Sequence, residues 1–174
     1  MHRMLLVFIV LLPSLVVAQT EAIEDNWADL KFLEGKWIDE KPGVSKVKQE
    51  YEFILEGKYL QMRTKAGFEP TERNPEGEVH EDLGIFSYDQ FRKTFVFRQF
   101  HSEGFVNQYI LDKKDSEINE LTFISEQIEN APEGTRAKVI FKFISEDEIE
   151  QSFHVAWPGK EYACFALNKL KRTK

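Results

Sequence analysis

Apolar and polar side chains alternate with a period of two through almost the whole chain from residue 36 onward. This pattern is typical of β-strands that bury one face. It predicts ten strands, near residues 36–40, 46–55, 58–66, 79–88, 93–101, 105–111, 117–126, 135–144, 147–156 and 161–170. Most of the connections are short turns, such as Glu56-Gly57 and Pro158-Gly159. Short turns join antiparallel neighbours, because a parallel return needs a crossover of about a dozen residues.

An open sheet of ten meandering strands has two unpaired edges, and closure into a barrel removes both. A two-sheet sandwich is the competing architecture, but it usually needs longer Greek-key connections than most of these. Before the first strand, Trp27, Leu30 and Leu33 follow helical spacing. Asn26 is placed to cap such a helix, which would end near Glu34. We therefore predict an all-β, up-and-down antiparallel closed β-barrel of about ten strands with a short N-terminal helix.

Residues 1–18 have the layout of a secretory signal peptide. His2 and Arg3 precede an apolar stretch that ends at the small residue Ala18. The stretch is shorter than the ~20 residues that a membrane-spanning helix needs, so an uncleaved anchor is the less favoured alternative. Cleavage there leaves residues 19–174 as a single barrel domain in a secreted or periplasmic protein.

The composition disfavours two classes of partner. The chain has 23 Lys and Arg against 30 Asp and Glu, and its formal net charge is −7. An acidic surface repels phosphate backbones and anionic lipids, which argues against binding to nucleic acid and, after signal cleavage, to membranes. Cys164 is the only cysteine, so no internal disulfide can form. Its alternation with Tyr162 and Ala166 predicts a small buried hydrophobic residue.

Gly35-Lys36-Trp37 opens the first predicted strand, and Lys169-Leu170-Lys171-Arg172 closes the last. With the strand from His80 to Asp89, residues 30–172 resemble the lipocalin-like calycins, in particular uncharacterised secreted bacterial proteins related to the haem-binding nitrobindin barrels. The resemblance implies a barrel with one end covered by the indole of Trp37 and a cation of the last strand. It makes Gly35, Trp37, Lys169 and Arg172 structural residues.

The resemblance also implies an interior cavity for a small apolar molecule. The candidate ligand-binding residues are Gln49, Tyr51, Phe53, Met62, Phe97, Gln99, Asn107, Tyr109, Phe141 and Phe143. The amides among them stand on otherwise apolar faces, so they need hydrogen-bond partners from a ligand, from buried water or from one another. Arg98 has the opposite parity to Phe95 and Phe97, which predicts that it faces solvent and does not hold a ligand carboxylate.

Haem is a second ligand that the resemblance raises. The related haem barrels bind iron through a histidine of the last strand, and this chain has none between Tyr162 and Arg172. His154, on the adjacent strand, has the parity of polar residues such as Glu150, and His101 lies at a turn. We therefore predict that both are surface histidines and not iron ligands.

The run His80-Glu81-Asp82 suggests a metal site, but neighbours on a strand point to opposite faces. We interpret the run as solvated and predict no metal site. The chain has no Gly-x-Ser-x-Gly elbow, His-Glu-x-x-His helix or phosphate-binding glycine loop, so nothing in it predicts an enzyme.

The leading hypothesis is a secreted, monomeric or weakly dimeric barrel that binds a fatty-acid-like or other apolar metabolite without chemistry of its own. Two alternatives remain. One is a nitrobindin-like haem barrel with peroxynitrite isomerase or gas-sensing activity. The other is a filled barrel that serves as a structural or interaction domain.

Overall fold

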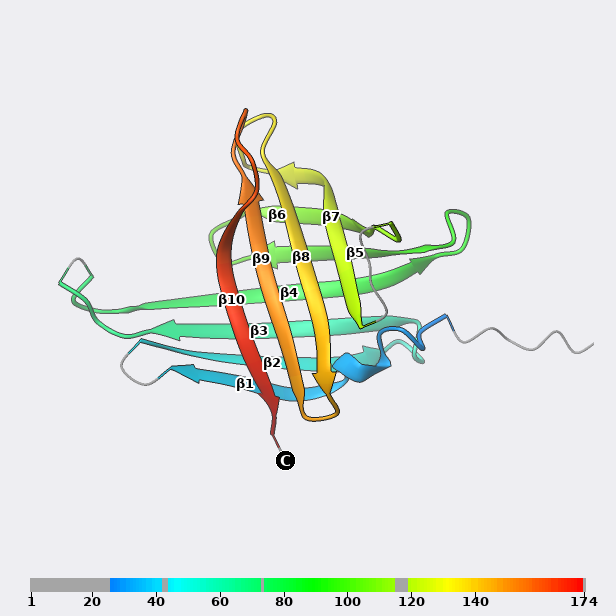
Figure 1. Ribbon diagram of the computed structural model, residues 1–174, viewed down its shortest axis with the longest axis horizontal. Helices are drawn as coiled ribbons and strands as arrows, with labels where there is room; N and C mark the ends of the chain where they lie inside the picture. Colours follow the sequence, from blue (N-terminus) through cyan, green and yellow to red (C-terminus); the bar gives the residue numbers. More distant parts are fainter. Residues whose placement is uncertain (1–25, 42–43, 73, 115–118, 174) are drawn as a thin grey trace, which may run out of the picture.

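The computed structural model describes residues 26–41, 44–72, 74–114 and 119–173, and it shows an all-β barrel of ten antiparallel strands (Figure 1). The order around the barrel follows the chain, and β10 pairs with β1 to close it. The predicted fold class is thus confirmed. The proposed signal peptide, residues 1–18, lies outside the described residues. No helix in the described part of the chain is long and apolar enough to span a membrane.

The strands lie within a few residues of the predicted ones. Their bounds are β1 (Gly35–Lys41), β2 (Ser45–Ile54), β3 (Tyr59–Phe68), β4 (Glu78–Asp89), β5 (Thr94–His101), β6 (Val106–Leu111), β7 (Glu120–Glu129), β8 (Arg136–Ser145), β9 (Glu148–Ala156) and β10 (Ala163–Arg172). In Figure 1 strands β8, β9 and β10 cross over β1 to β6, so the barrel has two faces that meet at a steep angle.

The predicted N-terminal helix is only a short 3-10 turn. It comprises Lys31–Leu33, and it follows turns in which the amide of Leu30 donates to the carbonyl of Trp27. The apolar residues Trp27, Leu30 and Leu33 recur every three residues, which suits the three residues per turn of a 3-10 helix. Leu30 and Leu33 are fully buried, so this turn plugs one end of the barrel.

Arg172 joins the two ends of the chain at this plugged end. Its guanidinium carbon lies 4.1 Å from the centroid of the Trp37 ring, within the range of a cation–π contact. The same guanidinium donates hydrogen bonds to the backbone carbonyls of Phe32, Glu34 and Glu146. The indole N–H of Trp37 donates to the carbonyl of Leu33 at 2.7 Å, which ties the first strand to the 3-10 turn.

Gly35 makes room for this arrangement. Its φ is +121°, and a Cβ there would lie 2.5 Å from Nη1 of Arg172. Only glycine tolerates both conditions, since any other side chain would strain the backbone and displace the guanidinium. The side chain of Lys169, in contrast, is exposed, and this residue contributes through its amide, which donates to Asp39.

The middle of the barrel is filled by aromatic rings. Phe86 stacks on Phe97 with 4.1 Å between ring centroids, and Phe97 in turn stacks on Tyr109 at 5.4 Å. Phe123 and Phe141 meet these rings edge to face. All five side chains are completely buried, and we call them the aromatic cluster. Such ring arrangements add about 0.5–1.5 kcal/mol per pair to the burial of apolar area.

The ladder between β1 and β10 is short. It covers two residue pairs, and the first of them is Trp37 with Arg172. Beyond these pairs the strands are bridged by side chains: the amide of Lys169 donates to Oδ2 of Asp39 at 3.0 Å. The barrel is therefore closed by backbone pairing only near its plugged end.

The ladder between β7 and β8 also stops early. It ends at Ile124 and Lys138, and the next amide, that of Ala137, donates to the hydroxyl of Ser125 instead. The β1–β10 and β7–β8 ladders thus both stop before the same end of the barrel. We call the end around Trp37 the closed end, and the opposite end, where β4 begins and β5 ends, the mouth.

Replacement of Trp37 by alanine tests the closed end. The change removes a buried indole and exposes one side of the Arg172 guanidinium, so we expect a loss of about 3–5 kcal/mol in the free energy of unfolding. Chemical denaturation measures this loss. Lys171→Ala, an exposed neighbour of Arg172, is the control and should stay within about 0.5 kcal/mol of the parent. A loss below about 1 kcal/mol for Trp37→Ala would contradict the role of the indole.

Candidate functional site

Polar side chains fill the barrel on the mouth side of the aromatic cluster, in two hydrogen-bonded groups. In the first group, Nε2 of Gln49 donates to Oε1 of Gln151 at 2.6 Å, and the hydroxyl of Tyr51 donates to Oε1 of Gln49 at 2.8 Å. All three side chains are buried. The Gln49–Gln151 hydrogen bond links β2 to β9 across the interior. It gives two buried amides the hydrogen-bond partner that buried polar groups require.

The second group joins β4, β5 and β6. Nδ2 of Asn107 donates to the hydroxyl of Tyr109 at 2.9 Å and lies 3.0 Å from Nε2 of His101. Nδ1 of His101 lies 2.9 Å from Oδ1 of Asp82, and the amide of Gln99 donates weakly to Oδ2 of the same carboxylate at 3.4 Å. Gln49, Gln99 and Asn107, the amides expected to need partners, thus bond to other side chains of the protein.

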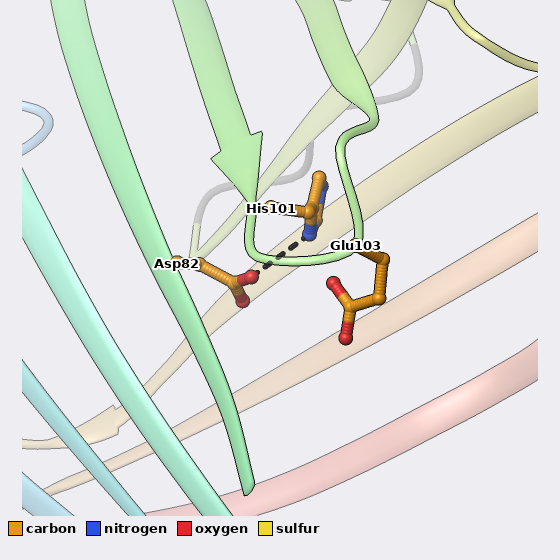
Figure 2. A group of neighbouring side chains, drawn as sticks. All are labelled: Asp82, His101 and Glu103. Atoms are coloured by element: carbon orange, nitrogen blue, oxygen red, sulfur yellow. Dashed lines mark hydrogen bonds and ion pairs between the residues drawn. The ribbon is translucent and has the colours of Figure 1, made fainter.

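A cluster of histidines and carboxylates forms the outer part of this second group (Figure 2). We call His80, Asp82, His101 and Glu103 the mouth cluster. His80 makes ion pairs with Glu103 and, at 2.9 Å, with Glu78. His101 and Asp82 are the most deeply placed members, with side chains 15% and 16% exposed. Figure 2 shows the carboxylates of Asp82 and Glu103 on the same side of the His101 ring.

Local backbone geometry explains this convergence. His80 and Asp82 are two residues apart on β4 and share its inner face, whereas Glu81 points outward and pairs with Lys65. Strand β5 ends at His101, and the turn that follows brings Glu103 back over the mouth. That turn is held by the amide of Ser102, which donates to the carbonyl of Glu81 at 3.0 Å.

The prediction that His80-Glu81-Asp82 is solvated is therefore wrong for His80 and Asp82, and His101 is not a surface residue. The argument that strand neighbours diverge is correct, but it applies only to Glu81. The overlooked signal is a spacing: His80 and Asp82 are two residues apart within one strand, which puts both side chains on the same face.

The apolar residues proposed to line a cavity lie farther inside the barrel than the mouth cluster. Met62, Phe97 and Phe141 have no exposed surface, so no space wide enough for water adjoins them. Phe53 and Phe143 lie near the closed end, where their ring centroids are 5.2 Å from that of Trp27 and 5.6 Å from that of Phe32, respectively. These side chains therefore fill the interior of the barrel.

Two other polar residues from the sequence analysis lie on the outside of the barrel. Arg98 donates to the side chains of Gln108 and Ser87 on the outer face. His154 shares the outer face of β9 with Ser152, and its Nε2 lies 3.0 Å from that hydroxyl. Partial burial, with a smaller effect of nearby Lys138, lowers the pKa of His154.

The prediction that Cys164 is buried is wrong, because its side chain is exposed. A β-bulge between Cys164 and Ala166 shifts the register of β10 against β9. One extra residue in a strand reverses the alternation of faces beyond it, so parity counted from the sequence fails there.

Two hollows lie at the surface. One, of about 640 Å³, lies along β1 to β4 and is lined by exposed charged side chains, among them Lys48 and Arg63, and by residues of the inner faces, among them Gln49 and Asp82. The other, of about 480 Å³, lies at the rim of the closed end beside Trp27 and Tyr88.

The two buried phenols of the polar groups hold their protons tightly. Burial raises the pKa of both Tyr51 and Tyr109 far above the usual value, because a phenolate inside the barrel would lose its hydration. For Tyr109 the hydrogen bond from Asn107 acts in the opposite direction, and the nearby Asp82 carboxylate adds to the rise.

Comparison of the chain with protein-family models and with curated proteins found no match. The structure itself defines the class: a closed, ten-stranded, up-and-down antiparallel barrel with a buried aromatic cluster, which is compatible with a calycin-like fold.

Alkaline titration tests the two phenols. Above the ordinary phenol pKa of about 10 the unfolded chain releases these protons and the folded chain keeps them, so stability falls as the pH rises. We expect Tyr51 and Tyr109 to ionise only when the barrel unfolds, as followed by tyrosinate absorbance and circular dichroism. The tyrosinate absorbance of the double variant Tyr51→Phe/Tyr109→Phe should follow that of the parent until the barrel unfolds and stay below it from the unfolding transition upward. A difference that develops while the barrel remains folded would contradict burial of these phenols.

Proposed function

We propose that the protein is a secreted, non-catalytic carrier that binds a small apolar molecule at the mouth of the barrel. The observation that supports this best is a set of incompletely buried apolar side chains on the inner face of the mouth. Ala66 and Phe68 come from β3, and Phe153 and Val155 come from β9, on the other face of the barrel. Apolar side chains from two opposing walls suit an apolar guest.

Further apolar side chains surround the mouth. Phe165 is 74% exposed, and its ring centroid lies 5.9 Å from that of Phe153. Trp157, just beyond the end of β9, is also exposed near the mouth. Exposed apolar side chains are common singly, but a group of them around an opening marks a binding surface.

The sealed closed end also supports a binding site at the mouth. The 3-10 turn, Trp37 and Arg172 seal that end, and the aromatic cluster fills the space behind them. A guest therefore enters from the mouth and rests above the buried polar groups. Gln99 and Asn107 there offer hydrogen bonds to a polar end of the guest, which is the usual division of labour in sites for apolar ligands.

The alternatives have different support. The complete burial of the aromatic cluster favours a filled barrel that acts as an interaction domain, and this is our second candidate. For haem, the outward position of His154 gives β9 no axial ligand directed into the barrel.

A fluorescent fatty-acid analogue tests the carrier function. We expect saturable binding of about one probe per protein, with displacement by long-chain fatty acids. Phe165→Ser removes an apolar ring at the mouth and should weaken binding by about tenfold, since burial of such a side chain contributes about 1.5–3 kcal/mol.

Ile144→Ser is the matched control, because Ile144 is an apolar residue 48% exposed at the closed end of β8. This variant should bind the probe like the parent. Equal effects of the two substitutions would show that the probe does not occupy the mouth. A parent protein that binds no probe would favour the filled interaction domain.

A further inference from the structure

The mouth cluster combines the donor atoms of a metal site. Nδ1 of His101, a carboxylate oxygen of Asp82 and a carboxylate oxygen of Glu103 all lie within 4.8 Å of one another (Figure 2). Nδ1 of His101 and Oδ1 of Asp82 are 2.9 Å apart. Neighbouring ligands of a tetrahedral zinc ion, at bonds of about 2.0–2.1 Å, stand about 3.3 Å apart. Small rotations of the side chains, chiefly of Glu103 on its exposed turn, would complete this geometry.

The charges of the cluster favour a cation. Asp82, Glu103 and the adjacent Glu78 bring three carboxylates together, and their ion pairs in the described part of the chain are with His80 and His101. Carboxylates gathered in one place repel one another, and a divalent ion between them would remove that repulsion.

Asn107 allows His101 to become a ligand. As placed, Nδ2 of Asn107 donates to Nε2 of His101, so the imidazole proton lies on Nδ1 and points at Asp82. Reversal of the amide puts its oxygen in the same position, where it accepts hydrogen bonds from Nε2 of His101 and from the hydroxyl of Tyr109. Nδ1 then presents a lone pair toward the two carboxylates, which is the arrangement that a metal ion requires.

We propose that the mouth cluster binds one divalent transition-metal ion through Asp82, His101 and Glu103. His80 supports the site by hydrogen bonding to Glu103, and Asn107 supports it by orienting His101. An imidazole with carboxylates suits Zn²⁺ and neighbouring transition ions better than Mg²⁺ or Ca²⁺, which prefer oxygen ligands. Three protein ligands leave the fourth tetrahedral position for water or for a polar group of a bound molecule. This site does not depend on the proposed carrier function.

Cobalt titration of the untagged protein tests the site, since Co²⁺ replaces Zn²⁺ and absorbs visible light when its coordination is tetrahedral. We expect one equivalent of Co²⁺ to give a saturable band that Zn²⁺ abolishes and that Mg²⁺ leaves unchanged. Zn²⁺ should also raise the midpoint of thermal unfolding, because it binds the folded chain. The band should persist in Cys164→Ser, which separates the mouth cluster from coordination by the exposed thiol. Absence of saturable Co²⁺ binding would overturn the proposal.

Substitutions locate the ion. His101→Gln and Glu103→Gln should each weaken Co²⁺ binding by more than about 100-fold, and Asn107→Leu should weaken it by about 10–100-fold. His154→Gln, which changes a histidine on the outer face, should leave binding unchanged. Glu103 lies on an exposed turn, so Glu103→Gln remains informative if a substitution at His101 unfolds the protein. Unaltered affinity in Glu103→Gln, or equal losses in Glu103→Gln and His154→Gln, would refute the assignment.

Discussion

Closure of the barrel depends on the contact between Arg172 and Trp37. The backbone ladder between the first and last strands covers two residue pairs, so pairing alone contributes little to closure. The guanidinium adds a cation–π contact with the indole and hydrogen bonds to three carbonyls, two of them from the 3-10 segment and one from the turn between β8 and β9. Hydrogen bonds that involve a charged group contribute about 1.5–3 kcal/mol each to stability. The Arg172 side chain therefore contributes more to holding the closed end together than the two backbone pairs alone.

The strands are paired less completely at the mouth than at the closed end. The β1–β10 and β7–β8 ladders both end before the mouth, and there the side chains of Asp39 and Ser125 accept hydrogen bonds from backbone amides in place of carbonyl groups. The aromatic cluster excludes solvent near the middle, and the buried amides lie between it and the mouth. The molecule is thus asymmetric along its axis: apolar and buried at the closed end, and partly exposed and rich in titratable groups at the mouth.

The sequence predicts the strands and their closure well, because a period of two and short turns leave few other topologies. The pairing of Trp37 with a cation came from resemblance, and the structure shows that Arg172 and not Lys169 makes the contact. Parity fails at Cys164, where a bulge changes the register. The mouth cluster was missed because it depends on the register of β4 against β5, which places Asp82 opposite His101. No pattern within a single strand specifies that register.

The polar groups connect the mouth to the core through a short chain of contacts. Asn107 lies between His101 and Tyr109, and the Tyr109 ring stacks on Phe97 within the aromatic cluster. If the amide of Asn107 reverses when an ion binds, the Tyr109 hydroxyl changes from acceptor to donor while its phenol stays protonated, as its raised pKa requires. An ion at the mouth would then alter the hydrogen-bonding character of the surface on which a guest rests, without moving the rings below. Ion and guest would share Asn107, which gives the two proposed sites a physical means of influencing each other.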